Sequence, residues 1–174
     1  MNAVLHIGLV VNPLAGIGGS LALKGSDGEQ MRAVVKQLPA AQRQRAHERS
    51  LRALRMLNDS TRVRFTCWAG DMGESTLQQL DFYTQVLGSA GAELTTALDT
   101  RMAAEQLCAA GVDIIVFAGG DGTARDICDV AGTRCPVLGV PAGVKMHSGV
   151  FAVSPEAAGE LLRRLAQGGL VGIG

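Results

Sequence analysis

Residues 112–127 read VDIIVFAGGDGTARDI, and this stretch decides the fold class of the chain. Its first seven residues predict a strand more clearly than any other segment, because they form a short apolar run rich in β-branched side chains. The glycine-rich turn GGDGT, at residues 119–123, follows at once, and a helix is predicted from there to about Val130. A strand, a tight turn and a helix in direct succession are typical of the repeating unit of a parallel sheet.

The rest of the chain continues this alternation. Strands are predicted over residues 4–11, 62–69, 92–96 and 136–140. Helices are predicted over residues 29–37, 42–58, 76–87, 99–111 and 154–167, with Asp99 and Ser154 as N-caps. The pattern predicts an α/β fold, a three-layer α/β/α domain with a mostly parallel sheet. Ligands of such sheets bind outside the carboxyl ends of the strands, and glycine-rich turns follow Val11, Ala118 and Val140 at such ends.

Length and composition limit the class of protein. The chain has 174 residues, of which 47% are hydrophobic, so we expect one globular domain over residues 1–174. The 16 basic residues balance the 16 acidic ones, and this zero net charge argues against a nucleic-acid-binding protein. No apolar run approaches the ~20 residues that a membrane span needs, and the start has no signal-peptide pattern. We therefore expect a cytoplasmic protein without a membrane span.

The four cysteines are Cys67, Cys108, Cys128 and Cys135. No two of them form a C-x-x-C pair, and three lie in apolar segments. We expect reduced, buried thiols that contribute to packing rather than to metal or redox chemistry.

Basic residues concentrate in residues 32–64, which hold nine of them against two acidic residues, whereas residues 65–130 hold two against ten. Arg45, Arg49 and Arg52 would share one face of the predicted helix. That face is interpreted either as a surface for phosphate or an acidic partner, or more simply as a solvated face that complements the acidic half of the chain.

Several enzyme classes are disfavoured because their motifs are missing. The dinucleotide fingerprint G-x-G-x-x-G begins at Gly16 and Gly18 but has Leu21 at its last position. The chain contains no Gly-Lys-Ser/Thr, which argues against a P-loop NTPase. It also lacks H-E-x-x-H and G-x-S-x-G, which argues against zinc proteases and α/β-hydrolases.

The turn at residues 119–123 has the composition of a phosphate-binding loop. Its glycines let backbone N–H groups approach anionic oxygens without a Cβ clash. Thr123 can cap the following helix, whose N-terminus adds a positive dipole. Asp121 would repel phosphate in a simple binding loop, but its carboxylate suits a group that accepts a proton from an attacking hydroxyl or helps to hold a metal. The alternative is a tight turn with a capping threonine and no ligand.

Residues 112–126 resemble the NAD kinase superfamily, which also contains diacylglycerol and other lipid kinases and shares the GGDGT signature. Three further segments narrow the resemblance: NPLAGIGG at residues 12–19, KGSDG at 24–28 and GVPAGVKMHSGVF at 139–151. With them, the chain looks like the ATP-NAD kinase-like branch that includes acetoin-catabolism protein X. The resemblance implies the α/β N-terminal domain of that family.

The resemblance also implies an activity: a kinase that uses ATP or polyphosphate to phosphorylate the ribose 2′-hydroxyl of NAD, giving NADP. Asp121 would be the general base for that hydroxyl. The residues that would bind the nucleotides are Asn12, Gly16, Gly18 and Gly19, then Gly119, Gly120, Gly122 and Thr123, and finally Lys145. Mg²⁺ would arrive with ATP, and no residue is assigned as a metal ligand. The family further implies a homo-oligomer.

Two residues near this turn keep two interpretations each. Arg125 could neutralise phosphate or pair with Asp129, four residues further on. His147 could contact a substrate or serve only the structure.

Members of the family carry a second, β-rich domain with an Asn-Glu/Asp motif that helps to bind the nucleotide substrate. The sequence contains no such motif, so we expect a single α/β nucleotide-binding domain without it. Two other functions therefore stay open. One is a non-catalytic nucleotide-binding module, and the other is a kinase of a different hydroxyl acceptor, such as a lipid or a small metabolite.

Overall fold

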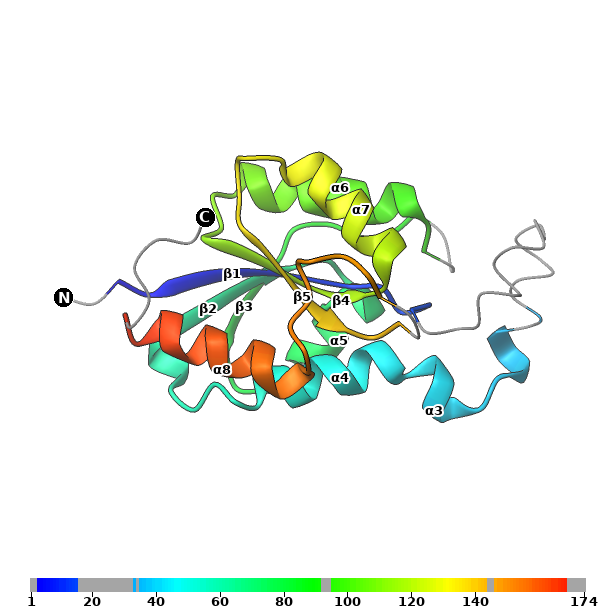
Figure 1. Cartoon of the computed structure of the whole chain (residues 1–174), viewed down its shortest axis with the longest axis horizontal. Helices are drawn as coiled ribbons and strands as arrows, with labels where there is room; N and C mark the ends of the chain where they lie inside the picture. The colour runs from blue at the N-terminus through cyan, green and yellow to red at the C-terminus, as the bar shows by residue number, and fades with distance from the viewer. Residues whose placement is uncertain (1–2, 16–32, 34, 92–94, 144–145, 169–174) are drawn as a thin grey trace.

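The computed structural model describes residues 3–15, 33, 35–91, 95–143 and 146–168, and within them a parallel sheet forms the centre (Figure 1). Its five strands are β1 (Leu5–Val11), β2 (Val63–Cys67), β3 (Tyr83–Val86), β4 (Ile114–Gly119) and β5 (Val137–Pro141). They lie in the order β3-β2-β1-β4-β5, and every neighbouring pair is parallel. The α/β class predicted from the sequence is confirmed.

Helices cover both faces of this sheet. They are α3 (Ala40–Arg43), α4 (Arg45–Leu54), α5 (Glu74–Leu77), α6 (Ala97–Ala109), α7 (Asp121–Ala131) and α8 (Pro155–Ala166), with two short 3-10 turns, η1 (Ser60–Arg62) and η2 (Gly70–Met72). In Figure 1, α6 and α7 lie together on one side of the sheet, and α4 and α8 lie together on the other. The molecule therefore has the three predicted layers.

The two central strands are buried on both faces, which explains their continuous apolar sequences. All six residues of β4 are buried, and in β1 only Leu5 is partly exposed. Alternate side chains join two cores. Leu9 and Val116 lie in the core with α4 and α8, whereas Val10 and Phe117 lie in the core with α6 and α7. This packing holds the carboxyl ends of β1 and β4 side by side.

The helix predicted over residues 76–87 is wrong over most of its length. The structure has the short helix α5 there, followed by strand β3, which pairs with β2 from Tyr83 to Val86. Tertiary contacts decide this outcome. The ring of Phe82 packs against that of Phe65 with centroids 5.0 Å apart, and the main chain of β3 extends the sheet by one strand.

Two other predicted elements differ from the structure, and a third is described only in part. The helix predicted over residues 42–58 divides into α3 and α4 and ends at Leu54. No strand forms at Thr95 and Thr96, and the rest of the strand predicted over residues 92–96 lies outside the described residues. In the helix predicted over residues 29–37, residues 33 and 35–37 are helical, and the others lie outside the described residues.

The helix caps are partly as predicted. Ser154 caps α8, and its hydroxyl accepts from the Ala157 amide at 3.0 Å. The N-cap of α6, however, is Thr96 and not Asp99. Asp99 completes a capping box instead, since its carboxylate accepts from the Thr96 backbone N–H at 2.8 Å.

Helices α4 and α8 pack together at Gly159, where a Cβ would clash with the Ala53 carbonyl oxygen and lie 2.6 Å from the Met56 side chain. We predict that Gly159→Ala lowers the free energy of unfolding by about 1–3 kcal/mol, the usual effect of overpacking, in urea denaturation. Gly122→Ala is the control, because among the described residues no atom lies within 4 Å of a Cβ at Gly122. An equal loss in both variants would contradict this explanation.

His6 is a titratable side chain buried within β1, only 6% exposed. Its Nε2 contacts the Thr66 hydroxyl, and its Nδ1 has no hydrogen-bond partner among the described residues. Desolvation lowers the pKa of His6, and Arg64 lowers it further, whereas Asp113 acts in the opposite direction. The unfolded chain therefore binds a proton more readily than the folded one.

It follows that the contribution of His6 to stability is present above about pH 6.5 and is lost as the pH falls below that value. We expect the free energy of unfolding of the wild type to fall more between about pH 7.5 and pH 5.5 than that of His6→Gln. Urea denaturation at a series of pH values measures both. Parallel curves would show that the His6 pKa is not lowered by folding.

Candidate functional site

The turn between β4 and α7 is built on contacts that only glycine allows. At Gly119, the last residue of β4, a Cβ would lie 2.6 Å from the Thr123 side chain. Gly120 faces Gly143, in the loop after β5, and a Cβ on Gly143 would lie 3.1 Å from the Gly120 Cα. The predicted phosphate-binding turn is therefore a tight strand-to-helix connection that lies against the loop after β5.

Asn12 and Thr123, both predicted to bind nucleotide, lie together and bind one another. The side-chain amide of Asn12 donates to the Thr123 hydroxyl at 2.9 Å, and its side-chain oxygen accepts from the Leu14 amide at 3.0 Å. The backbone N–H of Asn12 donates to the Ala118 carbonyl at 2.9 Å. These bonds join the carboxyl ends of β1 and β4. Both side chains thus shape the site and leave the backbone of the turn to face a ligand.

Backbone N–H groups at the start of α7 face the carboxyl edge of the sheet. The first N–H groups of a helix have no acceptor within it, and the N-cap, Gly120, has no side chain to cap them. The amides of Asp121, Gly122 and Thr123, together with the helix dipole, form a positive end that suits anionic oxygens.

The carboxylate of Asp121 is held by the loop after β5. Its Oδ1 accepts from the amides of His147 and Ser148, each at 3.0 Å, and its Oδ2 accepts from the His147 amide at 2.9 Å. These backbone hydrogen bonds hold the pKa of Asp121 below its usual range, and Arg125 acts in the same direction. Asp121 is therefore ionised at neutral pH. The backbone of His147 positions Asp121, so this residue has a structural role, which was one of its two interpretations.

A small recess of about 300 Å³ opens beside Asp121 and is lined also by Ala124, Arg125, Cys128 and Ser148. The pairing of Arg125 with Asp129, one of its two predicted interpretations, does not occur. Arg101, from α6, binds Asp129 at 2.9 Å and Asp126 at 3.1 Å instead. In the part of the chain that the structure describes, Arg125 forms no ion pair.

A larger cleft of about 820 Å³ lies over the carboxyl ends of β1 and β2. Its polar and loop residues include Pro13, Arg43, His47, Asp71, Ser75 and Gln79. No sequence pattern predicts this cleft, because its walls come from short segments far apart along the chain. One general rule could have located the cleft: ligands bind beyond the carboxyl ends of parallel strands. Applied to the strand predicted over residues 62–69, this rule indicates a site just after that strand.

His47 gives this cleft a polar wall of fixed orientation. Its Nδ1 lies 3.0 Å from the Thr76 hydroxyl, and the Gln79 side-chain amide donates to its Nε2 at 2.9 Å. Because Nε2 accepts, the neutral ring carries its proton on Nδ1 and donates it to Thr76. Both ring nitrogens are therefore oriented by neighbours from α5 and the residues after it.

The arginine face of α4 contributes mainly to packing. Arg52 binds Glu156 of α8 through two hydrogen bonds of 2.7 and 3.0 Å, and Arg49 donates to the Pro141 carbonyl at 3.0 Å. The interpretation as a solvated face with acidic partners is thus closer to the structure than a phosphate surface. The acidic partner lies in α8, however, and not in residues 65–130.

Four predicted nucleotide-binding residues, Gly16, Gly18, Gly19 and Lys145, lie outside the described residues. Their roles stay predictions.

The surroundings of all four cysteines favour the protonated thiol. Burial raises the pKa of Cys67 to about 12 and that of Cys135 to about 11, and desolvation also raises the pKa values of Cys108 and Cys128. All four are free, although only Cys67 and Cys135 are fully buried.

Over the described ranges, no three His, Cys, Asp or Glu side chains gather to hold a metal ion. The described helices also include none that is long and apolar enough to cross a membrane.

An all-parallel sheet in which β4, the neighbour of the central strand, leads through a glycine-rich turn into a helix is the arrangement of nucleotide-binding α/β domains. The family model of the ATP-NAD kinase N-terminal domain matches residues 7–170, nearly the whole chain. The chain therefore belongs to the NAD kinase family, which confirms the resemblance noted in the sequence. A search of curated proteins gives no match.

The bond between Asn12 and Thr123 predicts a specific pattern of stability. Thr123→Val removes the acceptor of the Asn12 amide at constant side-chain shape, and we expect a loss of about 1–3 kcal/mol in the free energy of unfolding. Thr123→Ser keeps the hydroxyl and is expected to lose less. Urea denaturation of both variants measures the difference, and a larger loss in Thr123→Ser than in Thr123→Val would show that methyl packing and not the hydrogen bond joins the two strands.

Proposed function

We propose that the chain transfers a phosphoryl group from ATP or polyphosphate to the ribose 2′-hydroxyl of NAD, giving NADP. The observation that carries this proposal is the carboxylate of Asp121, which is ionised and oriented at the first residue of α7, within the turn whose sequence resembles that of the family. A fixed carboxylate beside free backbone amides combines a proton acceptor with groups that stabilise phosphate charge.

Asp121 suits the role of general base through its Oδ2 atom. Oδ1 accepts two N–H groups, whereas Oδ2 accepts one and keeps a lone pair for a substrate hydroxyl. A carboxylate with a lowered pKa is a weak base. Phosphoryl transfer tolerates this weakness, because its loose transition state depends mainly on positioning and charge stabilisation. Asp121 would accept the hydroxyl proton as the new P–O bond forms.

Other parts of the chain would bind the substrates. The amides at the start of α7 would stabilise the transferred phosphoryl group, and Gly16, Gly18, Gly19 and Lys145 would meet phosphates as the family resemblance implies. The cleft of about 820 Å³ has the size of a ligand site and would hold the nucleoside part of a nucleotide.

Mg²⁺ would enter as part of the ATP substrate. Asp121 is a single carboxylate with both oxygens already hydrogen-bonded, and the described residues place no further acidic side chains with it to hold the ion. The cytoplasm would suit the four protonated thiols, and a homo-oligomer stays a prediction of the family resemblance.

The proposal is tested by incubating the purified protein with NAD and either Mg-ATP or polyphosphate and measuring NADP. Asp121→Asn is expected to lower kcat by about 10²- to 10⁴-fold, the usual contribution of a positioned base. Asp129→Asn is the matched control, because it changes another carboxylate of α7 that lies outside the recess. NADP formation by Asp121→Asn at the wild-type rate would contradict the assigned role.

A non-catalytic nucleotide-binding module is the second candidate, and the hydrogen bonds that already engage Asp121 favour it. Under that function the wild type binds ADP but forms no NADP, and Asp121→Asn binds ADP equally or more tightly because repulsion of phosphate is relieved. Consumption of ATP only when a lipid or another small hydroxyl compound is supplied would instead identify a kinase with a different acceptor.

A further inference from the structure

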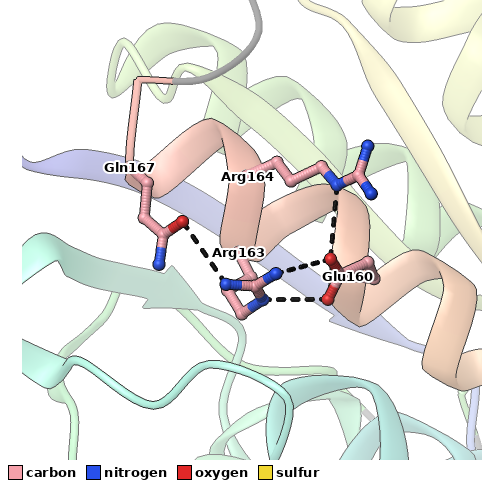
Figure 2. A network of polar contacts seen from close by, with 4 residues as sticks. All are labelled: Glu160, Arg163, Arg164 and Gln167. Carbon is pink, nitrogen blue, oxygen red and sulfur yellow. Dashed lines mark hydrogen bonds and ion pairs between the residues drawn. The ribbon is translucent and has the colours of Figure 1, made fainter.

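Within the described residues, six arginines form ion pairs with carboxylates. In Figure 2, Glu160 of α8 binds Arg163 at 2.6 and 2.8 Å and Arg164 at 3.2 Å. Arg134 binds Glu105 in the same bidentate way, at 2.7 and 3.1 Å. Carboxylates three or four residues away, or on a neighbouring helix, supply these partners.

Arg125 has no such partner, and the structure shows the reason. Two acidic residues of α7 lie near Arg125 in the sequence. Asp126 follows it directly, and Asp129 lies four residues further along the helix. Arg101, which reaches across from α6, binds both. The nearest other acid, Asp121, is held by two backbone amides and forms no ion pair with Arg125. Among the described residues the guanidinium of Arg125 thus has no carboxylate partner.

This unpaired charge lies on the wall of the recess beside Asp121. The other lining residues, Ala124, Cys128 and Ser148, are small and uncharged, and the recess has a volume of about 300 Å³. It has room for a phosphate group, whereas the larger cleft has the volume that a nucleoside needs. A planar guanidinium binds phosphate oxygens through two parallel hydrogen bonds, which a lysine cannot do.

We propose that Arg125 binds a phosphate group of the nucleotide substrate in this recess. This inference rests on the proposed function in one respect: the phosphate group is part of a nucleotide that binds beside Asp121. Asp121 lies on the same recess and repels phosphate, so the anion lies toward Arg125 while the carboxylate faces the hydroxyl. Arg125 and Asp121 are four residues apart on α7, on the same side of the helix. In this arrangement Arg125 binds the phosphate and Asp121 accepts the proton, at neighbouring positions of the recess.

The test is binding measured by calorimetry, with pyrophosphate, ADP, NAD and adenosine as separate probes. Arg125→Ala is expected to weaken pyrophosphate binding by about 10- to 100-fold, the loss of one charge-assisted contact, and to leave adenosine binding unchanged. Arg125→Lys is expected to recover only part of the affinity. Arg55→Ala is the matched control, an exposed arginine on α4's C-terminal side that forms no ion pair within the described residues and lines neither cavity.

The probes distinguish the source of the phosphate. A loss confined to ADP assigns Arg125 to the donor, and a loss confined to NAD assigns it to the acceptor. Unchanged ADP and NAD affinities in Arg125→Ala would overturn the proposal. An equal loss of adenosine binding, or no binding of any phosphate probe by the wild type, would also overturn it. Arg125-dependent binding without NADP formation would count against the proposed acceptor and leave this inference intact.

Discussion

The close contact between Gly119 and Thr123 is the constraint on which the site depends. It lets the chain leave β4 and enter α7 within two residues, and it puts the Thr123 hydroxyl where the Asn12 side chain can reach it. The hydrogen bond between Asn12 and Thr123 lies between the ends of β1 and β4. The chain first adds β2 and β3 on one side of β1, and then returns to add β4 and β5 on the other side. Loops diverge at such a point and leave a crevice for ligands.

Charge at this crevice is arranged differently from charge elsewhere on the molecule. On the outer helices, arginines and carboxylates pair with one another, as Arg52 does with Glu156 and Arg101 with two acids of α7. Beside the turn, Asp121 is held by backbone amides, which leaves its carboxylate ionised without an arginine bound to it. Two opposite charges therefore lie close together without cancelling, an arrangement that suits a site for both a hydroxyl and a phosphate.

The strand, turn and helix of residues 112–131 follow the local sequence closely, because burial of β4 on both faces requires an uninterrupted apolar run and the turn requires glycine. Residues 76–87 show the opposite case. Nothing in that segment by itself distinguishes a helix from the edge strand that forms, and the decision comes from Phe65 and the main chain of β2. Asp99 is a second case: the sequence suggested it as the N-cap of α6, but the cap is Thr96 and Asp99 completes the capping box three residues later.

The sequence by itself determined the α/β class and the strand, turn and helix of residues 112–131, because apolar runs and glycine-rich turns are local patterns. Only the tertiary structure decided that Asn12 and Thr123 bind each other, that Arg101 takes the partner of Arg125, and that a cleft forms around His47. Each of these outcomes joins residues that are 25 or more positions apart. Pairing at that separation depends on how the layers pack, which no local pattern encodes.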